Sequence, residues 1–274
     1  MNKRFPQMVL LGIKQFKDPY YQGFAAQVAF YFLLSLVPMI IVLSQLLGLF
    51  DVSLDFMEEW IDAYVSSDMT AILKDLLSYS PVGASNVFFI ILALWSASRA
   101  QFSVMRITNY TFTDGKSTGK GYIRERIRAV KTIAITLFTL AFALIIFVYG
   151  ELIVKIIFGA VMEGSELDTL WTYLRWPIAM LLYFFMVSYN YYVLPTEKVT
   201  FKQIVPGSIF ASVGMLIVTI FYSNYTNYAT NYDIIYGSLA SIVALLFWFY
   251  FLAWVLCLGI VFNKVWKDTE NLDL

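Results

Sequence analysis

Five polar side chains recur at spacings of three and four residues in one apolar stretch: Ser96, Arg99, Ser103, Arg106 and Tyr110. Residues at these spacings lie on one side of an α-helix, so the two arginines are expected one above the other. A guanidinium group presents a planar fork of N–H donors that matches two oxygens of a phosphate or carboxylate. The pattern therefore indicates a site that binds an anion.

The expected depth of Arg99 in a membrane makes this pattern informative. Arg99 follows Asn86, near the start of the apolar stretch, by 13 residues, and that length corresponds to ~20 Å of helix. A hydrocarbon core is about 30 Å thick. An unpaired charge well inside it costs at least ~2.5–3.5 kcal/mol on insertion scales. We therefore expect Arg99 to have a compensating interaction.

No carboxylate is expected at the depth of Arg99. Glu151 is the only acidic residue within the apolar segments, and Lys155, four residues later on the same helical face, is its natural partner. Arg106 lies nearer the inner surface, where its side chain can extend to the headgroups. Two explanations for Arg99 remain. Backbone carbonyls at a kinked helix satisfy it, or a ligand brings negative charge into a partly wet cavity.

The composition is that of an integral membrane protein. Of 274 residues, 60% are hydrophobic and 14% are charged, whereas globular proteins have about 25% charged residues. Six apolar segments are each long enough to cross a bilayer as a tilted helix. We predict an all-α, polytopic membrane protein that forms a single transmembrane domain over residues 1–274. Its six transmembrane helices are expected at about 24–50, 86–112, 131–158, 172–194, 206–228 and 235–263.

Lys and Arg are distributed unevenly between the connecting segments. Fourteen of the nineteen lie in alternate segments, and the segments on the opposite side hold only Lys74. Because cytoplasmic loops are enriched in Lys and Arg, this pattern predicts that both termini are cytoplasmic. The basic segments are 1–23, 112–131, 195–205 and 264–274.

Two segments outside the spans also show helical periodicity. Residues 1–23 predict a short amphipathic helix on the cytoplasmic surface, with a disordered tail as the alternative. Residues 51–85, after the first span, predict two short amphipathic helices on the outer surface. This outer helical loop is acidic, so a carboxylate site for a divalent cation is an alternative, although a solvated acidic face produces the same pattern.

The chain contains no histidine and a single cysteine, Cys257. The lack of histidine removes Ser-His and Cys-His nucleophile pairs, a histidine general base and the usual zinc sites. The basic inner loop 112–131 has no P-loop pattern and favours contact with anionic headgroups. The sequence therefore predicts no catalytic residues, no metal and no cofactor.

Polar residues in the other apolar segments complete the candidate site. In a membrane such residues normally face the bundle interior or a wet cavity, although interhelical hydrogen bonding alone would explain each of them. Relays of Asp, Glu or His, which proton-coupled pumps need, are missing from the middle of these segments. The candidate ligand-binding residues are Gln27, Tyr31, Ser35, Ser96, Arg99, Ser103, Arg106, Asn190 and Tyr236.

Short motifs spread along the chain resemble the YihY/BrkB family of bacterial inner-membrane proteins. They are AAQVAFY at 25–31 with SLVP at 35–38, LWSASR at 94–99, PGS at 206–208, YGSLA at 236–240 and LGIVFN at 258–263. The resemblance covers nearly the whole chain. It implies a six-helix protein of the bacterial inner membrane, and some members are linked to envelope lipid handling or serum resistance. The family also carries the label ribonuclease BN, which a chain without histidine does not support.

Three functional hypotheses follow. The first is a transporter or flippase-like protein that handles an anionic lipid or amphiphile, with membrane lipids as its partners. The alternative is a non-transporting scaffold that binds another envelope protein. A membrane enzyme is disfavoured because no nucleophile and base are expected within reach of each other, and no nucleic-acid partner is expected. The sequence leaves the substrate, the energy source and a homo-oligomer open.

Overall fold

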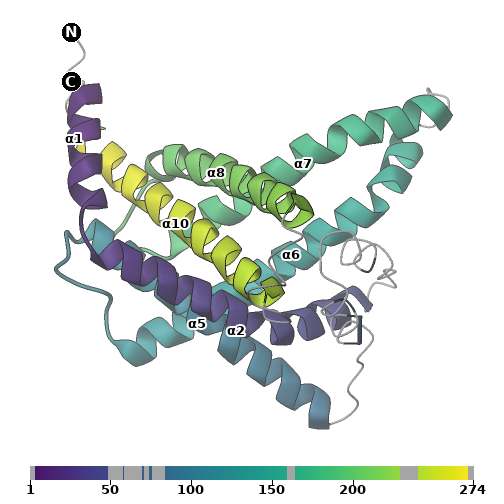
Figure 1. Ribbon diagram of the computed structural model, residues 1–274, viewed down its shortest axis with the longest axis horizontal. Helices are drawn as coiled ribbons and strands as arrows, with labels where there is room; N and C mark the ends of the chain where they lie inside the picture. Colours follow the sequence, from purple (N-terminus) through teal and green to yellow (C-terminus); the bar gives the residue numbers. More distant parts are fainter. Residues whose placement is uncertain are drawn as a thin grey trace.

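The computed structural model describes residues 4–48, 58, 70, 74–75, 84–158, 164–228 and 240–270. Within these residues the chain forms helices and connecting turns without a β-strand, which confirms the predicted all-α fold (Figure 1). Most of the predicted outer helical loop, 51–85, and the candidate residue Tyr236 lie outside the described residues. The helices are α1 (Arg4–Phe16), α2 (Tyr20–Gly48), α5 (Ala84–Phe112), α6 (Tyr122–Phe158), α7 (Gly164–Val193), α8 (Phe201–Tyr228) and α10 (Ala240–Asp268).

Three of these helices are long and apolar enough to cross a membrane, judged by length and composition over the described residues. They are α2, α8 and α10, in which stretches of 26, 22 and 27 residues have mean hydropathies of 2.3, 2.2 and 2.4. A span needs about 20 predominantly apolar residues. The other long helices, α5, α6 and α7, contain 29, 37 and 30 residues. Each predicted segment thus corresponds to one long helix.

Several helices extend beyond the apolar segments that predict them. α6 begins at Tyr122 rather than at residue 131, and α7 begins at Gly164 rather than at residue 172. The added first turns of α6 contain Arg124, Glu125 and Arg128. Arg and Glu are good helix formers, so the hydrogen-bonded helix continues where the side chains are too polar for hydrocarbon. Hydropathy marks the apolar part of a helix and not its ends.

A capped corner separates the amphipathic helix α1 from α2. Asp18 Oδ1 accepts a hydrogen bond from the Tyr20 backbone N–H at 3.0 Å, and Pro19 supplies the fixed backbone torsion that suits the first position of a helix. The other carboxylate oxygen of Asp18 accepts a hydrogen bond from Tyr110 Oη at 2.8 Å. The corner is therefore attached to the end of α5. The predicted N-terminal helix is present, but shorter than 1–23.

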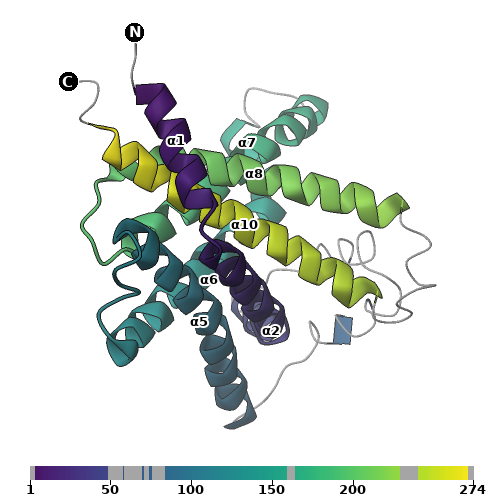
Figure 2. The ribbon, with the colours of Figure 1, turned by 60° about the vertical axis from the view of Figure 1, so that its left-hand side comes forward.

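Helix α10 lies at the centre of the helix bundle, where it packs against α1, α2, α5 and α8 (Figures 1 and 2). It approaches α8 closely through glycine. The Gly207 backbone N–H donates to Asn263 Oδ1 at 2.7 Å, and a Cβ built on Gly207 would lie 2.2 Å from the Gly259 carbonyl oxygen. Tyr191 Oη of α7 donates to the Leu256 carbonyl at 2.8 Å. Three helices thus meet where larger side chains would not fit.

Replacing Gly207 with alanine should destabilise this crossing. The new methyl group would overlap a backbone oxygen that cannot move away alone, so we expect a loss of about 1–3 kcal/mol in unfolding free energy and a lower melting temperature in detergent. Gly23→Ala in α2 is the matched control, because a Cβ there has no atom within 4 Å. Equal melting temperatures for the two variants would contradict the close approach.

Candidate anion-binding site

Arg99 occupies the middle of α5, between the rings of Tyr31 from α2 and Trp95 from its own helix. Its guanidinium carbon is 5.7 Å from the Tyr31 ring centroid and 6.0 Å from that of Trp95. The side chain is half-buried and makes no hydrogen bond or ion pair with any described residue. Cation–π contacts at these distances are weak compared with a carboxylate. Arg99 therefore retains its hydrogen-bonding capacity.

A second arginine, Arg126 from the first turns of α6, lies against the same Trp95 ring. Its guanidinium carbon is 4.4 Å from the ring centroid, and its Nη2 donates to the Trp95 carbonyl at 3.2 Å. The residue is only 8% exposed, and its Nε is buried without a hydrogen-bond partner among the described residues. Burial lowers the pKa of the Arg126 guanidinium from its usual value, and the nearby charge of Arg99 acts in the same direction. An arginine stays charged despite such a shift.

Arg128, three residues after Glu125 in the same helix, has a carboxylate partner that neutralises its charge. Its Nη1 donates to Glu125 Oε2 at 2.6 Å, and its Nη2 donates to the carbonyls of Val193 and Leu194 at 2.8 and 3.2 Å. The Glu125 side chain is buried, so the carboxylate of this ion pair is shielded from water. By contrast, the two arginines at Trp95 have no described carboxylate within 4.0 Å.

The polar contacts at this end of the protein hold the first turns of α6 in place. Asn109 of α5 is buried, and its Oδ1 accepts hydrogen bonds from the backbone N–H and the Oγ1 of Thr196 at 2.7 and 2.8 Å. Its Nδ2 donates to the Thr118 carbonyl at 3.4 Å. One asparagine thus connects α5 to the two segments that precede α6 and follow α7. These contacts attach the segment before α6 to the end of α5.

The remaining predicted site residues have different surroundings. Ser103 Oγ donates to the Arg99 carbonyl at 3.1 Å and Ser35 Oγ to the Phe32 carbonyl at 3.0 Å, so both hydroxyl protons are used within their own helices. The structure therefore joins Tyr31 to Arg99 and leaves these two serine hydroxyls committed to backbone oxygens. Of the other candidates, Ser96 is buried, and Gln27 and Arg106 are half-buried.

Asn190 belongs to a separate polar contact between α5 and α7. Its Oδ1 accepts a hydrogen bond from Gln101 Nε2, and its Nδ2 donates to the Met186 carbonyl at 2.8 Å. Interhelical hydrogen bonding was the simpler explanation for such residues, and it applies here. The predicted pairing of Glu151 with Lys155 involves a side chain outside the described set.

Sequence reasoning missed Arg126 because it assigned the residue to a basic loop. The signal that could have found it is the helical spacing of Tyr122, Arg126 and Ala129, which continues the periodicity of α6 toward the N-terminus. Trp95 was missed because a tryptophan in an apolar segment fits a lipid-facing position equally well.

The comparisons with known proteins identify the family. The family model described as "Virulence factor BrkB" matches residues 13–273. The chain belongs to the BrkB family. This confirms the resemblance noted in the sequence motifs.

Two curated relatives illustrate how far the similarity of this BrkB-family chain extends. The putative ribonuclease-like protein YfkH of Bacillus subtilis is 27% identical over 254 residues, which cover 92% of each chain. A UPF0761 membrane protein of Pseudoalteromonas translucida is 32% identical over 68 residues, which cover 25% of this chain and 22% of that protein. No solved structure matches the chain significantly.

Replacing Asn109 with alanine should weaken the connection between α5 and the segment that follows α7. The substitution leaves the Thr196 backbone N–H without its acceptor, and an unsatisfied buried donor costs about 1–3 kcal/mol. We expect a lower melting temperature for Asn109→Ala than for the exposed control Ser117→Ala. The measurement is thermal unfolding in detergent, and equal values for the two variants would show that this support is dispensable.

Proposed function

We propose that this chain is a six-span membrane protein that binds the anionic headgroup of a lipid, or of a similar amphiphile, between Arg99 and Arg126 and carries it across the membrane. One observation carries the proposal: two guanidinium groups contact the same Trp95 ring, and no described carboxylate lies within 4.0 Å of either. A phosphate group would supply the missing negative charge.

The electrostatics favour an anion at this place. Two like charges brought together at a partly buried position repel each other more strongly than they would in water, because the effective dielectric constant is lower. An anion between them reverses the sign of both interactions. A phosphodiester offers two free oxygens, and guanidinium groups bind such oxygens in a bidentate manner. The buried Nε of Arg126 adds an N–H donor that a ligand or water would satisfy.

The contact between Arg126 and Trp95 also bears on the depth of the site. Arg126 belongs to the basic segment that the Lys and Arg distribution assigns to the cytoplasmic side. Since Arg126 contacts the middle of α5, we place Arg99 near the inner headgroup level rather than deep in hydrocarbon. The exposed apolar side chains of Ile123 and Ile127 would then face lipid. At this level, placing one arginine costs little free energy. The unusual feature is that Arg99 and Arg126 lie beside the same ring.

The six-span arrangement and the cytoplasmic location of both termini are part of the proposal. Arg4, at the start of α1, stacks on Trp266 near the end of α10, with its guanidinium carbon 4.0 Å from the ring centroid. The two described ends of the chain therefore lie together (Figure 2). An even number of spans produces this placement, and the basic residues favour the cytoplasmic side of a bacterial inner membrane.

Ribonuclease activity is not part of the proposal, although one relative is named ribonuclease-like. The chain has no histidine, and the paired arginines have no described carboxylate beside them that could act as a general base. A non-transporting scaffold remains the alternative, and a transport measurement separates it from the proposal.

Lipid translocation in proteoliposomes tests the proposed function. We expect the protein to move a labelled anionic phospholipid faster than a zwitterionic one. Arg99→Gln and Arg126→Gln should each weaken headgroup binding by about ten-fold or more, because each removes charge-assisted hydrogen bonds worth about 1.5–3 kcal/mol. The rate for the anionic lipid at limiting concentration should fall accordingly.

Arg124→Gln is the matched control for this experiment. It removes the same charge from the same turns of α6, but Arg124 is exposed. We expect it to retain the wild-type preference for the anionic lipid. If folded wild-type protein moves neither lipid, the transport function is wrong and the scaffold alternative is favoured. If all three variants behave as the wild type, the site is wrong.

A further inference from the structure

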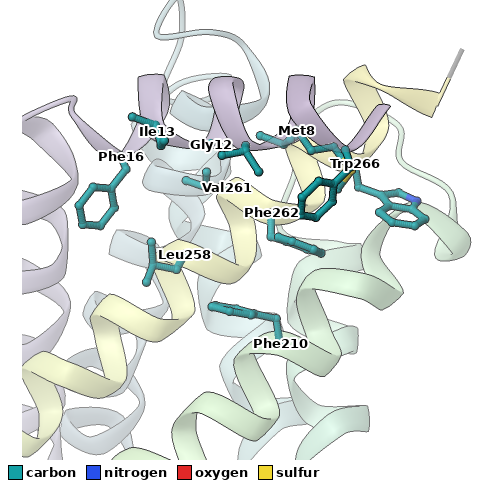
Figure 3. A pocket seen from close by; sticks show the side chains of 12 residues that line it. Met8, Gly12, Ile13, Phe16, Phe210, Leu258, Val261, Phe262 and Trp266 are labelled. Carbon is teal, nitrogen blue, oxygen red and sulfur yellow. The ribbon is translucent and has the colours of Figure 1, made fainter. Parts of the chain in front are cut away.

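An apolar groove lies between α1 and the two helices beneath it, α8 and α10, and shares no residue with the site of the paired arginines. Its volume is about 560 Å³, within the range of about 300–1,000 Å³ that is usual for ligand pockets. Figure 3 shows Phe16 at one end, Trp266 at the other, and Phe210 and Phe262 along the floor. These two floor rings are stacked, with centroids 5.7 Å apart. All twelve residues that line the groove are apolar or glycine.

Gly12 keeps the groove open. It lines the groove from α1, and a Cβ built on it would meet no atom within 4 Å. Glycine is a poor residue for a helix interior because it loses the most conformational freedom on folding. Gly207 is needed because two helix backbones approach closely there, whereas no close contact with another helix requires a glycine at position 12. The missing side chain at Gly12 leaves empty space on the side of α1 that faces the groove.

A positive charge lies at the Trp266 end of the groove. Arg4 stacks on Trp266, which lines one end. Its Nη2 donates to the Trp266 carbonyl and its Nε to Thr269 Oγ1, both at 3.5 Å. Lys17 is exposed one residue after the other end of α1. The helix α1 contains no acidic residue. A ligand that matches this surface combines an apolar body with a negative end.

We infer that one acyl chain of an anionic phospholipid occupies this groove, with its headgroup beside Arg4. An extended peptide does not fit as well, because its backbone N–H and C=O groups would find no polar side chain in the lining and would remain unsatisfied. An acyl chain has no such groups. The length of α1, 13 residues or ~20 Å, gives the chain a continuous wall. The bound lipid would attach α1 to α8 and α10.

This site is independent of the function proposed for Arg99 and Arg126. It shares no residue with that site, and it concerns a lipid that stays bound rather than one that crosses the membrane. Arg99→Gln should therefore leave binding in the groove unchanged. If lipid transport through Arg99 and Arg126 is not found, lipid binding in the groove can still be correct, and the reverse also holds.

Quenching of tryptophan fluorescence by brominated acyl chains tests the inference in detergent-solubilised protein. The probes are brominated phosphatidylglycerol, which is anionic, and brominated phosphatidylcholine, which is zwitterionic. The Trp266 contribution is the difference between the wild type and Trp266→Phe. We expect saturable quenching of this contribution by phosphatidylglycerol, with about ten-fold weaker binding of phosphatidylcholine because Arg4 repels its choline ammonium group, which offsets the attraction of its phosphate.

Gly12→Leu is the decisive variant and Gly23→Leu its matched control. Both glycines have open space around a new Cβ, and leucine is a better helix former, so both variants should fold. Gly12→Leu fills the groove and should weaken phosphatidylglycerol binding by about ten-fold or more, since it removes space for several buried methylene groups. Gly23→Leu, outside the groove, should bind as the wild type.

Three results would overturn the inference. They are equal quenching by the two lipids, unchanged binding in folded Gly12→Leu, and a lipid-free dimer that Gly12→Leu dissociates, which would assign the groove to a second copy of the chain. If Gly12→Leu does not fold, Arg4→Gln decides instead. Its preference for phosphatidylglycerol should disappear, and a retained preference would contradict the proposed headgroup position.

Discussion

The contact between Arg126 and Trp95 determines how the candidate site is built. Through this contact the first turns of α6 lie beside the middle of α5, and not beyond its end. A basic residue from a connecting segment thereby becomes a neighbour of Arg99. Without it, Arg99 would be a single half-buried cation between two aromatic rings, which a helix bundle can tolerate. With it, two guanidinium groups lie beside the same Trp95 ring.

Nearby polar contacts show that cations elsewhere on the same side of the protein do have acidic partners. Arg128 in the same helix has Glu125 and two backbone carbonyls. Lys264 has Asp268 at 2.9 Å and Asp114 at 3.4 Å. These two cations are thus neutralised within the described residues, whereas the pair at Trp95 is not. A buried charge without compensation destabilises a fold, and the proposed anion would supply this compensation.

The centre of the protein follows a different principle, in which small side chains allow helices to approach. Gly207 and Gly259 bring α8 and α10 into backbone contact, and Asn263 Oδ1 accepts a hydrogen bond from the Gly207 N–H at the crossing. Gly12 has the opposite effect, since it leaves space between α1 and α10. The same residue type thus closes one helix contact and opens another, and only the packing around it distinguishes the two.

The sequence by itself determined the helical class, the long apolar segments and the amphipathic N-terminal helix. It also marked Arg99 as a charge within an apolar segment that needs a compensating interaction. These features depend on periodicity and composition, which are local properties of the chain. The family also followed from short motifs, and the glycines in two of them proved to form the α8–α10 crossing. Only the tertiary structure decided which residues meet: Asn190 pairs with Gln101, and Arg126 and Arg99 lie beside the same Trp95 ring.

Periodicity shows which face of a helix a residue occupies, but not how far a neighbouring helix is displaced along that face. That displacement is set by contacts between segments distant in sequence, such as the hydrogen bond from Arg126 to the Trp95 carbonyl. It therefore appears only when the helices are packed together, and this is why the sequence could indicate Arg99 but not its neighbour Arg126.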